Sequence, residues 1–255
     1  MTQPALGILT GISYVSGLDY YRGINERFCA GTPTGHLMVP NPPIVMASVD
    51  CDEYVHYLTL KSFDRVAEHL LVGVRKLAAA GCDLLVIASN TGHIAVPAIE
   101  KEFPKLRILH IADCLAYRLK QRGFSDAGLI GTKPTMEEDY LKSRLALHGI
   151  TTHVPKGGEL QEDIYEIICQ ELSFSIFKDE SRARMVEAIL GLKARGAEAC
   201  VLGCTEIELL VKQEHVPDLA LFPSAEIHIE TAAGVLLQQV TLDDILPPPP
   251  QGTAG

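Results

Sequence analysis

The sequence predicts an α/β protein made of two lobes, each built on a parallel β-sheet. Short apolar segments alternate with helical segments, which is typical of parallel strands joined by helices. Residues 81–91 and 196–206 also share one pattern: a glycine, an acidic residue, a short apolar strand and then a nucleophilic side chain. Residues 5–11 and 126–132 form a second such pair, each upstream of its partner. This duplication predicts two Rossmann-like lobes related by a pseudo-twofold axis, with a cleft between them.

The expected strands are the apolar runs between turn residues. They lie at residues 5–10, 43–48, 83–88, 106–110, 126–130, 199–203 and 218–222. Helices are predicted over residues 61–80 and 180–195, where apolar residues recur at spacings of three and four. Gly81 and Gly196 follow these helices directly and are suited to a left-handed C-cap.

Three further segments are a loop, residues 31–43, and two helical segments, residues 163–177 and 224–240. Residues 31–43 are rich in glycine and proline, so we expect a loop over the site or at its rim. Residues 163–177 are expected to be helical, and residues 224–240 are expected to form a final helix that covers the first lobe. The duplication divides the chain into a first α/β lobe, a second α/β lobe and a flexible proline-rich tail. The first lobe comprises residues 1–112 with 222–245, and the second lobe comprises residues 113–221. The tail comprises residues 246–255.

Composition excludes several classes of function. The chain has 255 residues, 47% hydrophobic and 21% charged, as in an ordinary globular protein. Its net charge of −10 disfavours nucleic acid and anionic membranes as partners, because both require a basic surface. No apolar run is long enough to span a membrane, and the first residues lack the blocks of a signal peptide. We therefore expect a cytoplasmic protein.

The cysteines and glycines exclude several kinds of bound group. Seven cysteines are widely spaced without a Cys-x-x-Cys pair, which argues against a disulfide framework and a structural zinc site. We find no glycine-rich phosphate-binding loop followed by lysine, and no cluster of metal-ligating residues. The sequence therefore predicts that no pyridoxal phosphate, nucleotide or metal cofactor is needed.

Small and hydroxyl-bearing residues follow several of the predicted strands. These segments are residues 10–13, 89–91, 131–132 and 204–206. Ligands of parallel α/β sheets bind beyond the carboxyl ends of the strands. Asn90, Thr91 and Thr205, with exposed amides at helix starts, would suit a carboxylate. The alternative is that Ser89, Asn90 and Thr205 only cap helices.

Cys204 is the candidate nucleophile. It lies at the start of a predicted helix, where the thiolate is favoured and the pKa can fall below the usual value of about 8.5. A cysteine considered alone is more often a small buried residue. Its counterpart in the first repeat is Ser89 rather than an apolar residue, which favours a chemical role. Cys200, earlier on the same strand, is expected to belong to the core.

At these residues the chain resembles the aspartate/glutamate racemase family of cofactor-independent racemases. Residues 203–206 match its Gly-Cys-Thr-Glu motif, and residues 89–91, followed by His93, match its Cys-Asn-Thr motif except that Ser89 replaces the cysteine. A branch of broad-specificity amino-acid racemases also has a hydroxyl residue there, and the chain resembles that branch most. Further points of similarity are residues 7–13, 110–113 and 131–136.

The resemblance implies a racemase that interconverts L- and D-amino acids in an active site in the cleft between the lobes. Cys204 would remove the α-proton of an L-substrate, and Ser89 would be a weaker acid/base on the opposite face. Glu206 would tune Cys204, and His93 would support the site. The implied substrate-binding residues are Ile12, Ser13, Asn90, Thr91, Thr132 and Thr205. The resemblance also implies a homodimer.

Other functions remain open at this point. A site with only Cys204 could serve a decarboxylase or a cis-trans isomerase of the same superfamily, acting on a small dicarboxylate. A two-lobed protein that only binds a small ligand is disfavoured by the missing signal peptide and by Cys204. The accepted side chain is not assigned: Ile12 and Leu58 are apolar, and Ser173 stands where many aspartate-specific members have lysine.

Overall fold

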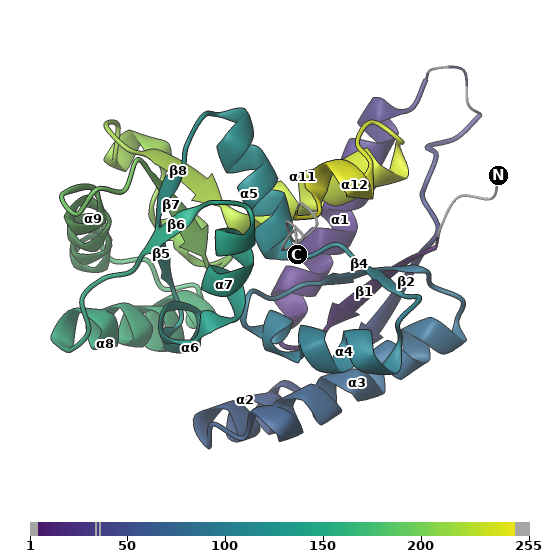
Figure 1. The fold of residues 1–255 in the computed structure, drawn as a ribbon, viewed down its shortest axis with the longest axis horizontal. Coiled ribbons are helices and arrows are strands. Elements are labelled where there is room, and N and C mark those ends of the chain that lie inside the picture. The colour runs from purple at the N-terminus through teal and green to yellow at the C-terminus, as the bar shows by residue number, and fades with distance from the viewer. Residues whose placement is uncertain (1–4, 34, 36, 248–255) are drawn as a thin grey trace, which may run out of the picture. The chain divides into compact units, whose positions relative to one another are not determined.

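The computed structural model describes residues 5–33, 35 and 37–247, and the chain forms two compact units. Unit 1 comprises Met1–Ile111 with His228–Leu242, and unit 2 comprises Ala112–Ile227 with Asp243–Gly255. Each unit contains a four-stranded sheet whose strands all pair in parallel, with helices packed against it (Figure 1). The predicted α/β class with two parallel sheets is confirmed.

Unit 1 is built on a sheet with the strand order β2-β1-β3-β4. Its strands are β1 (Leu6–Thr10), β2 (Ile44–Ser48), β3 (Leu84–Ile87) and β4 (Arg107–Ile108). Its helices before residue 111 are α1 (Tyr14–Gly31), α2 (Cys51–Thr59), α3 (Phe63–Ala79), the 3-10 helix η1 (Thr91–Ala95) and α4 (Val96–Glu102). Apolar side chains of α3 and α4 pack on β1 and β3 to form one core, and Figure 1 shows α1 on the other side of this sheet.

Unit 2 repeats this arrangement with the strand order β6-β5-β7-β8. Its strands are β5 (Asp126–Gly131), β6 (Thr151–His153), β7 (Ala199–Gly203) and β8 (Ala220–Pro223). Its helices are α5 (Ile111–Gln121), α6 (Lys133–Glu137), α7 (Asp139–Leu147), α8 (Glu159–Glu166), the π-helix η2 (Ile167–Glu171), the 3-10 helix η3 (Leu172–Phe174), α9 (Asp179–Lys193), α10 (Ile207–Leu210), the 3-10 helix η4 (Gln213–His215), α11 (Ser224–Leu236) and α12 (Leu242–Ile245). Helices α5, α11 and α12 contain residues of both units.

The two repeats agree in backbone detail as well as in strand order. The Asp83 amide donates to the Ala5 carbonyl at 3.3 Å, and the Glu198 amide donates to the Asp126 carbonyl at 2.8 Å. In unit 1 the bond joins the residue before β3 to the residue before β1. In unit 2 the bond joins the residue before β7 to the first residue of β5. The shared topology and these equivalent bonds support the predicted duplication.

The predicted helix ends are also observed. Gly81, after α3, has φ +83°, and Gly196, after α9, has φ +104°. These left-handed conformations are strained for residues with a side chain, so glycine ends both helices. Helix α11, expected over residues 224–240, is shorter than expected and ends at Leu236; a further short helix, α12, follows it.

Strand β6 and helix α2 are two of the elements for which the sequence analysis gave no range. Strand β6 has the sequence Thr-Thr-His, and it pairs only with β5 at the edge of the sheet. It therefore lacks the apolar run that marks the buried strands. Helix α2 is the second such element; only its Tyr54 is buried, so its apolar period is weak.

We expected residues 31–43 to form a loop over the site or at its rim. Within unit 1, this expectation is wrong. The described part of this segment connects α1 to β2, and the Leu6 amide donates to the Pro43 carbonyl at 2.9 Å. Both of these residues lie at the start of parallel strands. The segment therefore reaches the amino edge of the sheet, whereas the candidate site residues follow the carboxyl ends.

The lobes differ in extent from the expected boundaries. We expected the first lobe to resume at residue 222, but Phe222 lies in β8 and pairs with Val201 of β7. The chain re-enters unit 1 at His228, and residues 243–245 belong to unit 2. Most of the expected proline-rich tail, residues 248–255, lies outside the described residues.

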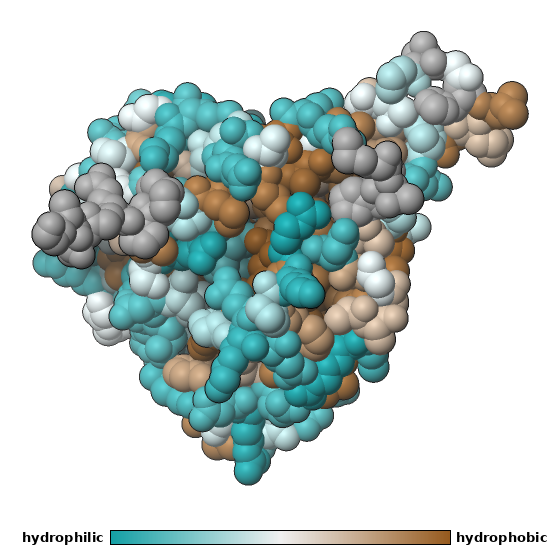
Figure 2. Space-filling view, turned by 45° about the vertical axis from the view of Figure 1, so that its right-hand side comes forward, coloured by the Kyte–Doolittle hydropathy of each residue, from teal (hydrophilic) through white to brown (hydrophobic). Residues whose placement is uncertain are grey.

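The surface mixes charged and apolar side chains. Figure 2 shows apolar patches among mostly hydrophilic residues. On α1, Tyr14, Leu18 and Tyr21 recur on one helix face and are exposed.

None of the helices in the described part of the chain combines the length and apolar character needed to span a membrane. The homodimer implied by resemblance stays a prediction.

Candidate active site

The ends of β1 and β3 bring several predicted residues of unit 1 together. These strands are neighbours, and Leu9 pairs with Ile87 near their carboxyl ends. Ile12 then packs against the turn that follows β3. A Cβ built on Gly92 would lie 2.8 Å from Ile12 Cδ1, so glycine is needed for this close approach. Ile12 and the Ser89 turn are therefore parts of one site.

Ser89 lies two residues after Ile87, the last residue of the buried strand β3. Its Oγ accepts a hydrogen bond from the Gly92 amide at 3.2 Å, and its carbonyl accepts one from His93 Nδ1 at 2.8 Å. Asn90 and Thr91 follow it and are buried. The capping interpretation fits the Ser89 hydroxyl, but the Asn90 side chain makes no capping bond to η1.

Ser13 ends the connection between β1 and α1 at this site. Its Oγ accepts from the Ser16 amide at 3.3 Å, which makes Ser13 the N-cap of α1. Cys51, which the sequence did not single out, donates its thiol to the Ile12 carbonyl at 3.0 Å. This contact links the start of α2 to the connection between β1 and α1.

In unit 2, Cys204 and Glu206 form a hydrogen-bonded pair just beyond β7. The Cys204 thiol donates to Glu206 Oε2 at 2.8 Å, and the Thr205 hydroxyl donates to the same oxygen at 2.6 Å. A carboxylate that accepts from a thiol can also take its proton. The pair therefore has the parts of a thiol nucleophile and its base.

Thr132 lies at the end of the neighbouring strand, since Gly131 of β5 pairs with Gly203 of β7. Its hydroxyl is 2.9 Å from the Thr135 hydroxyl, which is 3.0 Å from the Tyr140 hydroxyl. This chain of hydroxyls fixes Thr132 at the same sheet edge as Cys204. The sequence did not identify Thr135 or Tyr140.

The expectation of a lowered pKa for Cys204 is wrong. Burial raises the pKa of this thiol well above its usual value, and the Glu206 carboxylate raises it further by its charge and by accepting the thiol hydrogen bond. Only a hydrogen bond from the Glu206 backbone lowers the pKa. Helix α10, which follows, has four residues and offers little dipole. Cys204 therefore rests as a thiol, although part of its side chain remains accessible.

Cys169 and Tyr165 are neighbours of this pair that the sequence analysis missed. They lie one helical turn apart and are hydrogen-bonded to each other. Burial is the main cause that raises the Cys169 pKa, and the charge of Glu206 raises it further. Cys169 belongs to the π-helix η2, an irregularity that is frequent at functional sites. Cys200 is fully buried, as predicted, and burial raises its pKa to about 12.

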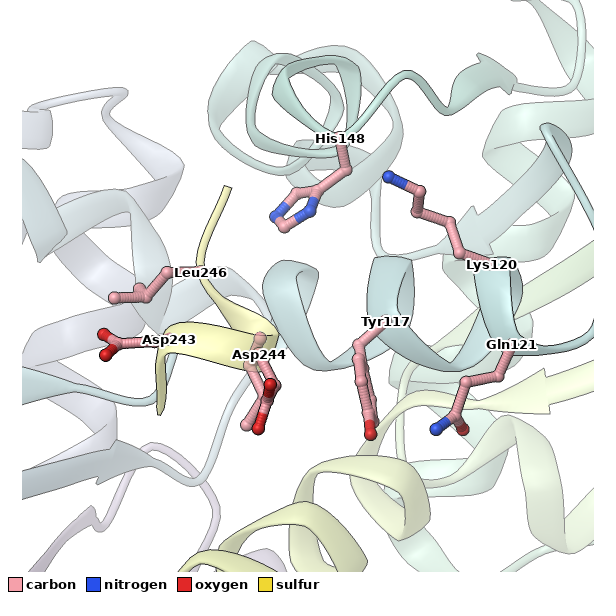
Figure 3. A pocket seen from close by; sticks show the side chains of 8 residues that line it. Tyr117, Lys120, Gln121, His148, Asp243, Asp244 and Leu246 are labelled. Atoms are coloured by element: carbon pink, nitrogen blue, oxygen red, sulfur yellow. The ribbon is translucent and has the colours of Figure 1, made fainter. Parts of the chain in front are cut away.

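A cavity of about 380 Å³ lies elsewhere in unit 2 (Figure 3). It is lined by Tyr117, Lys120, Gln121, His148 and residues 243–246. None of the predicted site residues lines it. Within the described residues, no group of three or more histidine, cysteine or acidic side chains is arranged to hold a metal ion.

A family model described as Asp/Glu/Hydantoin racemase matches residues 9–232. A Yersinia pestis protein provisionally described as an Asp/Glu racemase is 33% identical, over 92% of this chain and 100% of that chain, with a TM-score of 0.83. An aspartate racemase homologue from Pyrococcus horikoshii OT3 is 27% identical, over 91% of this chain and 98% of that chain, with a TM-score of 0.75. A glutamate racemase isoform from Bacillus anthracis is 19% identical, over 94% of this chain and 84% of that chain, with a TM-score of 0.63; this similarity concerns the fold alone.

Proposed function

Because the chain belongs to the Asp/Glu/Hydantoin racemase family, we propose that it is an amino-acid racemase that removes and returns the α-proton of its substrate. The observation that carries this proposal is the hydrogen-bonded Cys204–Glu206 pair beyond β7. Ser89 occupies the equivalent strand end in the duplicated unit. Both strand ends therefore carry a side chain that can exchange a proton.

Cys204 is the proposed base for an L-substrate. It rests as a thiol, so its proton must first leave, and Glu206 accepts it along the existing hydrogen bond. The thiolate then removes the α-proton, and its sulfur carries that proton at the end of this step. In the reverse direction, the Cys204 thiol returns the proton and Glu206 restores the resting state.

Ser89 is the proposed partner on the opposite face of the same α-carbon. The Gly92 amide occupies one lone pair of its oxygen, while the hydroxyl proton stays available for transfer. Donating that proton leaves an alkoxide, which the Gly92 amide stabilises and which water reprotonates. Among the described residues, no carboxylate or imidazole accepts the Ser89 hydroxyl proton. Ser89 is therefore a weaker acid/base than Cys204.

The negative charge that develops during proton removal needs donors around the substrate carboxylate. We propose this role for the polar residues at the ends of the strands, with Ile12 beside the substrate. The polar residues are Ser13, Asn90, Thr91, Thr132 and Thr205. Thr205 would turn its hydroxyl proton from Glu206 to the substrate carboxylate when the substrate binds. The proposed reaction uses no pyridoxal phosphate or metal, because the thiol, the carboxylate and these donors supply the required groups. A cytoplasmic location stays a prediction.

Proton exchange at the α-carbon tests the proposed reaction directly. The protein, dialysed against EDTA, is incubated with single L-amino acids in D₂O, and NMR follows the α-proton. We expect deuterium to enter the D-product during turnover, with slower entry into the remaining L-substrate. Activity that is lost on dialysis and restored by a metal would contradict cofactor independence.

The single-cysteine alternatives predict different products. The bonds of Ser89 within the described part of the chain, to the Gly92 amide and to His93 Nδ1, involve no acceptor for its hydroxyl proton. This favours the alternatives as the second candidate, since a decarboxylase or a cis-trans isomerase would need only Cys204. A decarboxylase would release CO₂ from a malonate-like acid, and an isomerase would convert a small unsaturated dicarboxylate. If no amino acid exchanges its α-proton while one of these acids reacts, racemisation is the wrong assignment.

The substitution Ser89→Cys is expected to raise kcat/KM about tenfold or more, in both directions equally. A thiol at this position gives an accessible thiolate that the hydroxyl lacks. The equality follows because a racemisation has an equilibrium constant of one in achiral water. The measurement is kcat/KM from each pure enantiomer, with Ser89→Ala as the matched control. An alanine variant as active as the wild type would remove Ser89 from the reaction.

A further inference from the structure

His93 makes two hydrogen bonds that fix which of its ring nitrogens carries a proton. Nδ1 lies 2.8 Å from the Ser89 carbonyl, which can only accept, so Nδ1 is the donor. Nε2 lies 3.2 Å from the Ile111 amide, which can only donate, so Nε2 is the acceptor. Both bonds are satisfied only by a neutral imidazole protonated on Nδ1.

The bond to Ser89 replaces a backbone bond that an ordinary helix would form. In an α-helix the His93 amide would donate to the carbonyl four residues earlier, that of Ser89. Here the His93 amide donates to the Asn90 carbonyl at 3.1 Å, in 3-10 geometry. The imidazole of His93 then satisfies the carbonyl that this geometry leaves open. Ser89 is thus kept outside the helix, at the end of its strand.

The surroundings of His93 hold its ring in place without adding charge. The ring packs against His110 and His228, with centroid separations of 4.5 Å and 5.9 Å. His228 bridges the Tyr20 hydroxyl at 2.9 Å and the Leu109 carbonyl at 2.8 Å. Burial is the main cause that lowers the pKa of His228 to about 3, so His228 is neutral in the physiological range. The side chains of the three histidines and of Tyr20 are almost completely buried.

We propose that His93 is a positioning residue: its Nδ1–H bond to the Ser89 carbonyl ties Ser89 to the 3-10 turn of residues 90–93 and so places the Ser89 hydroxyl for proton transfer. This inference rests on the proposed racemisation for its effect on activity. The turn geometry and the ring tautomer can be tested without any substrate.

Two substitutions separate the bonds of His93. In His93→Asn the side-chain amide nitrogen takes the place of Nδ1 and can still donate to Ser89. In His93→Gln the side-chain oxygen reaches the place of Nε2 and can still accept from Ile111, but the donor to Ser89 is lost. Both remove the ring from the same buried stack. A purely structural role predicts losses of activity that follow the losses of thermal stability in both variants.

We expect kcat to be at least about tenfold lower in His93→Gln than in His93→Asn, with similar KM values and similar melting temperatures. Hydrogen exchange of the Gly92 and His93 amides should be faster in the glutamine variant, and ¹⁵N NMR of the wild type should show His93 protonated on Nδ1. Equal kcat values with equal amide protection, or a ring protonated on Nε2, would overturn the proposal. If the wild type racemises no amino acid, the proposed function fails, while the NMR and exchange results still decide the role of His93 in the turn.

Discussion

Cys204→Ala is expected to lower kcat/KM for α-proton exchange by about 10³-fold or more, because general acid–base groups commonly contribute 10²–10⁴-fold. The variant removes the sulfur that receives the substrate proton, and Glu206 loses its thiol donor while keeping the Thr205 hydroxyl. The fold should survive, since losing one partly exposed sulfur at a strand end costs about 1 kcal/mol. The measurement is deuterium exchange with the best amino acid of the panel, with circular dichroism to check folding.

Cys200→Ala is the matched control for this experiment. Cys200 lies on β7, the strand that Cys204 follows, but it is fully buried and its thiol donates to the Val201 carbonyl at 3.8 Å. Its replacement should lower stability by a similar amount while leaving kcat/KM unchanged. Iodoacetamide should inactivate the wild type through Cys204, and substrate should protect. If Cys204→Ala keeps most of its activity, the nucleophile is another residue, and Cys169 would be tested next.

Glu206→Gln is expected to reduce kcat/KM about 10²-fold, because the acceptor of the Cys204 proton is lost. At the same time, the pKa of Cys204 should fall, since the negative charge and the accepting carboxylate that raise it are both removed. Burial, the largest cause of the raised pKa, remains. The variant should therefore be alkylated by iodoacetamide at lower pH than the wild type, although it is less active.

In Glu206→Gln, the rate of alkylation at a given pH should rise while kcat/KM falls. This opposite change distinguishes a base from a residue that only supports the fold. A structural role for Glu206 would lower activity without shifting the alkylation profile toward lower pH. Thr205→Val provides a control, because it removes the second hydrogen bond to the same carboxylate oxygen and keeps the charge. An alkylation profile that shifts equally in Glu206→Gln and Thr205→Val would contradict the assignment.

The fold class and the positions of the nucleophilic residues along the chain could be predicted from local sequence patterns. Strands β1, β3, β5 and β7 are apolar runs that are buried on both faces, so the hydrophobic pattern marks them. Gly81 and Gly196 end helices through their own backbone conformation. Such signals are local, and the duplication repeats them. Ser89 and Cys204 could therefore be assigned to equivalent strand ends from residue spacing alone.

The environment of Ser89 and Cys204, in contrast, depends on contacts between segments that are distant in the sequence. The raised pKa of Cys204 depends on burial and on Glu206, and the proximity of Cys169 depends on how η2 packs in unit 2. The tautomer of His93 depends on the Ile111 amide, eighteen residues away, and on the 3-10 turn after β3. Strand β6 escaped prediction because its pairing with β5, rather than an apolar pattern of its own, defines it. Desolvation and hydrogen bonding between distant segments arise only when the chain folds, so residue spacing could not reveal them.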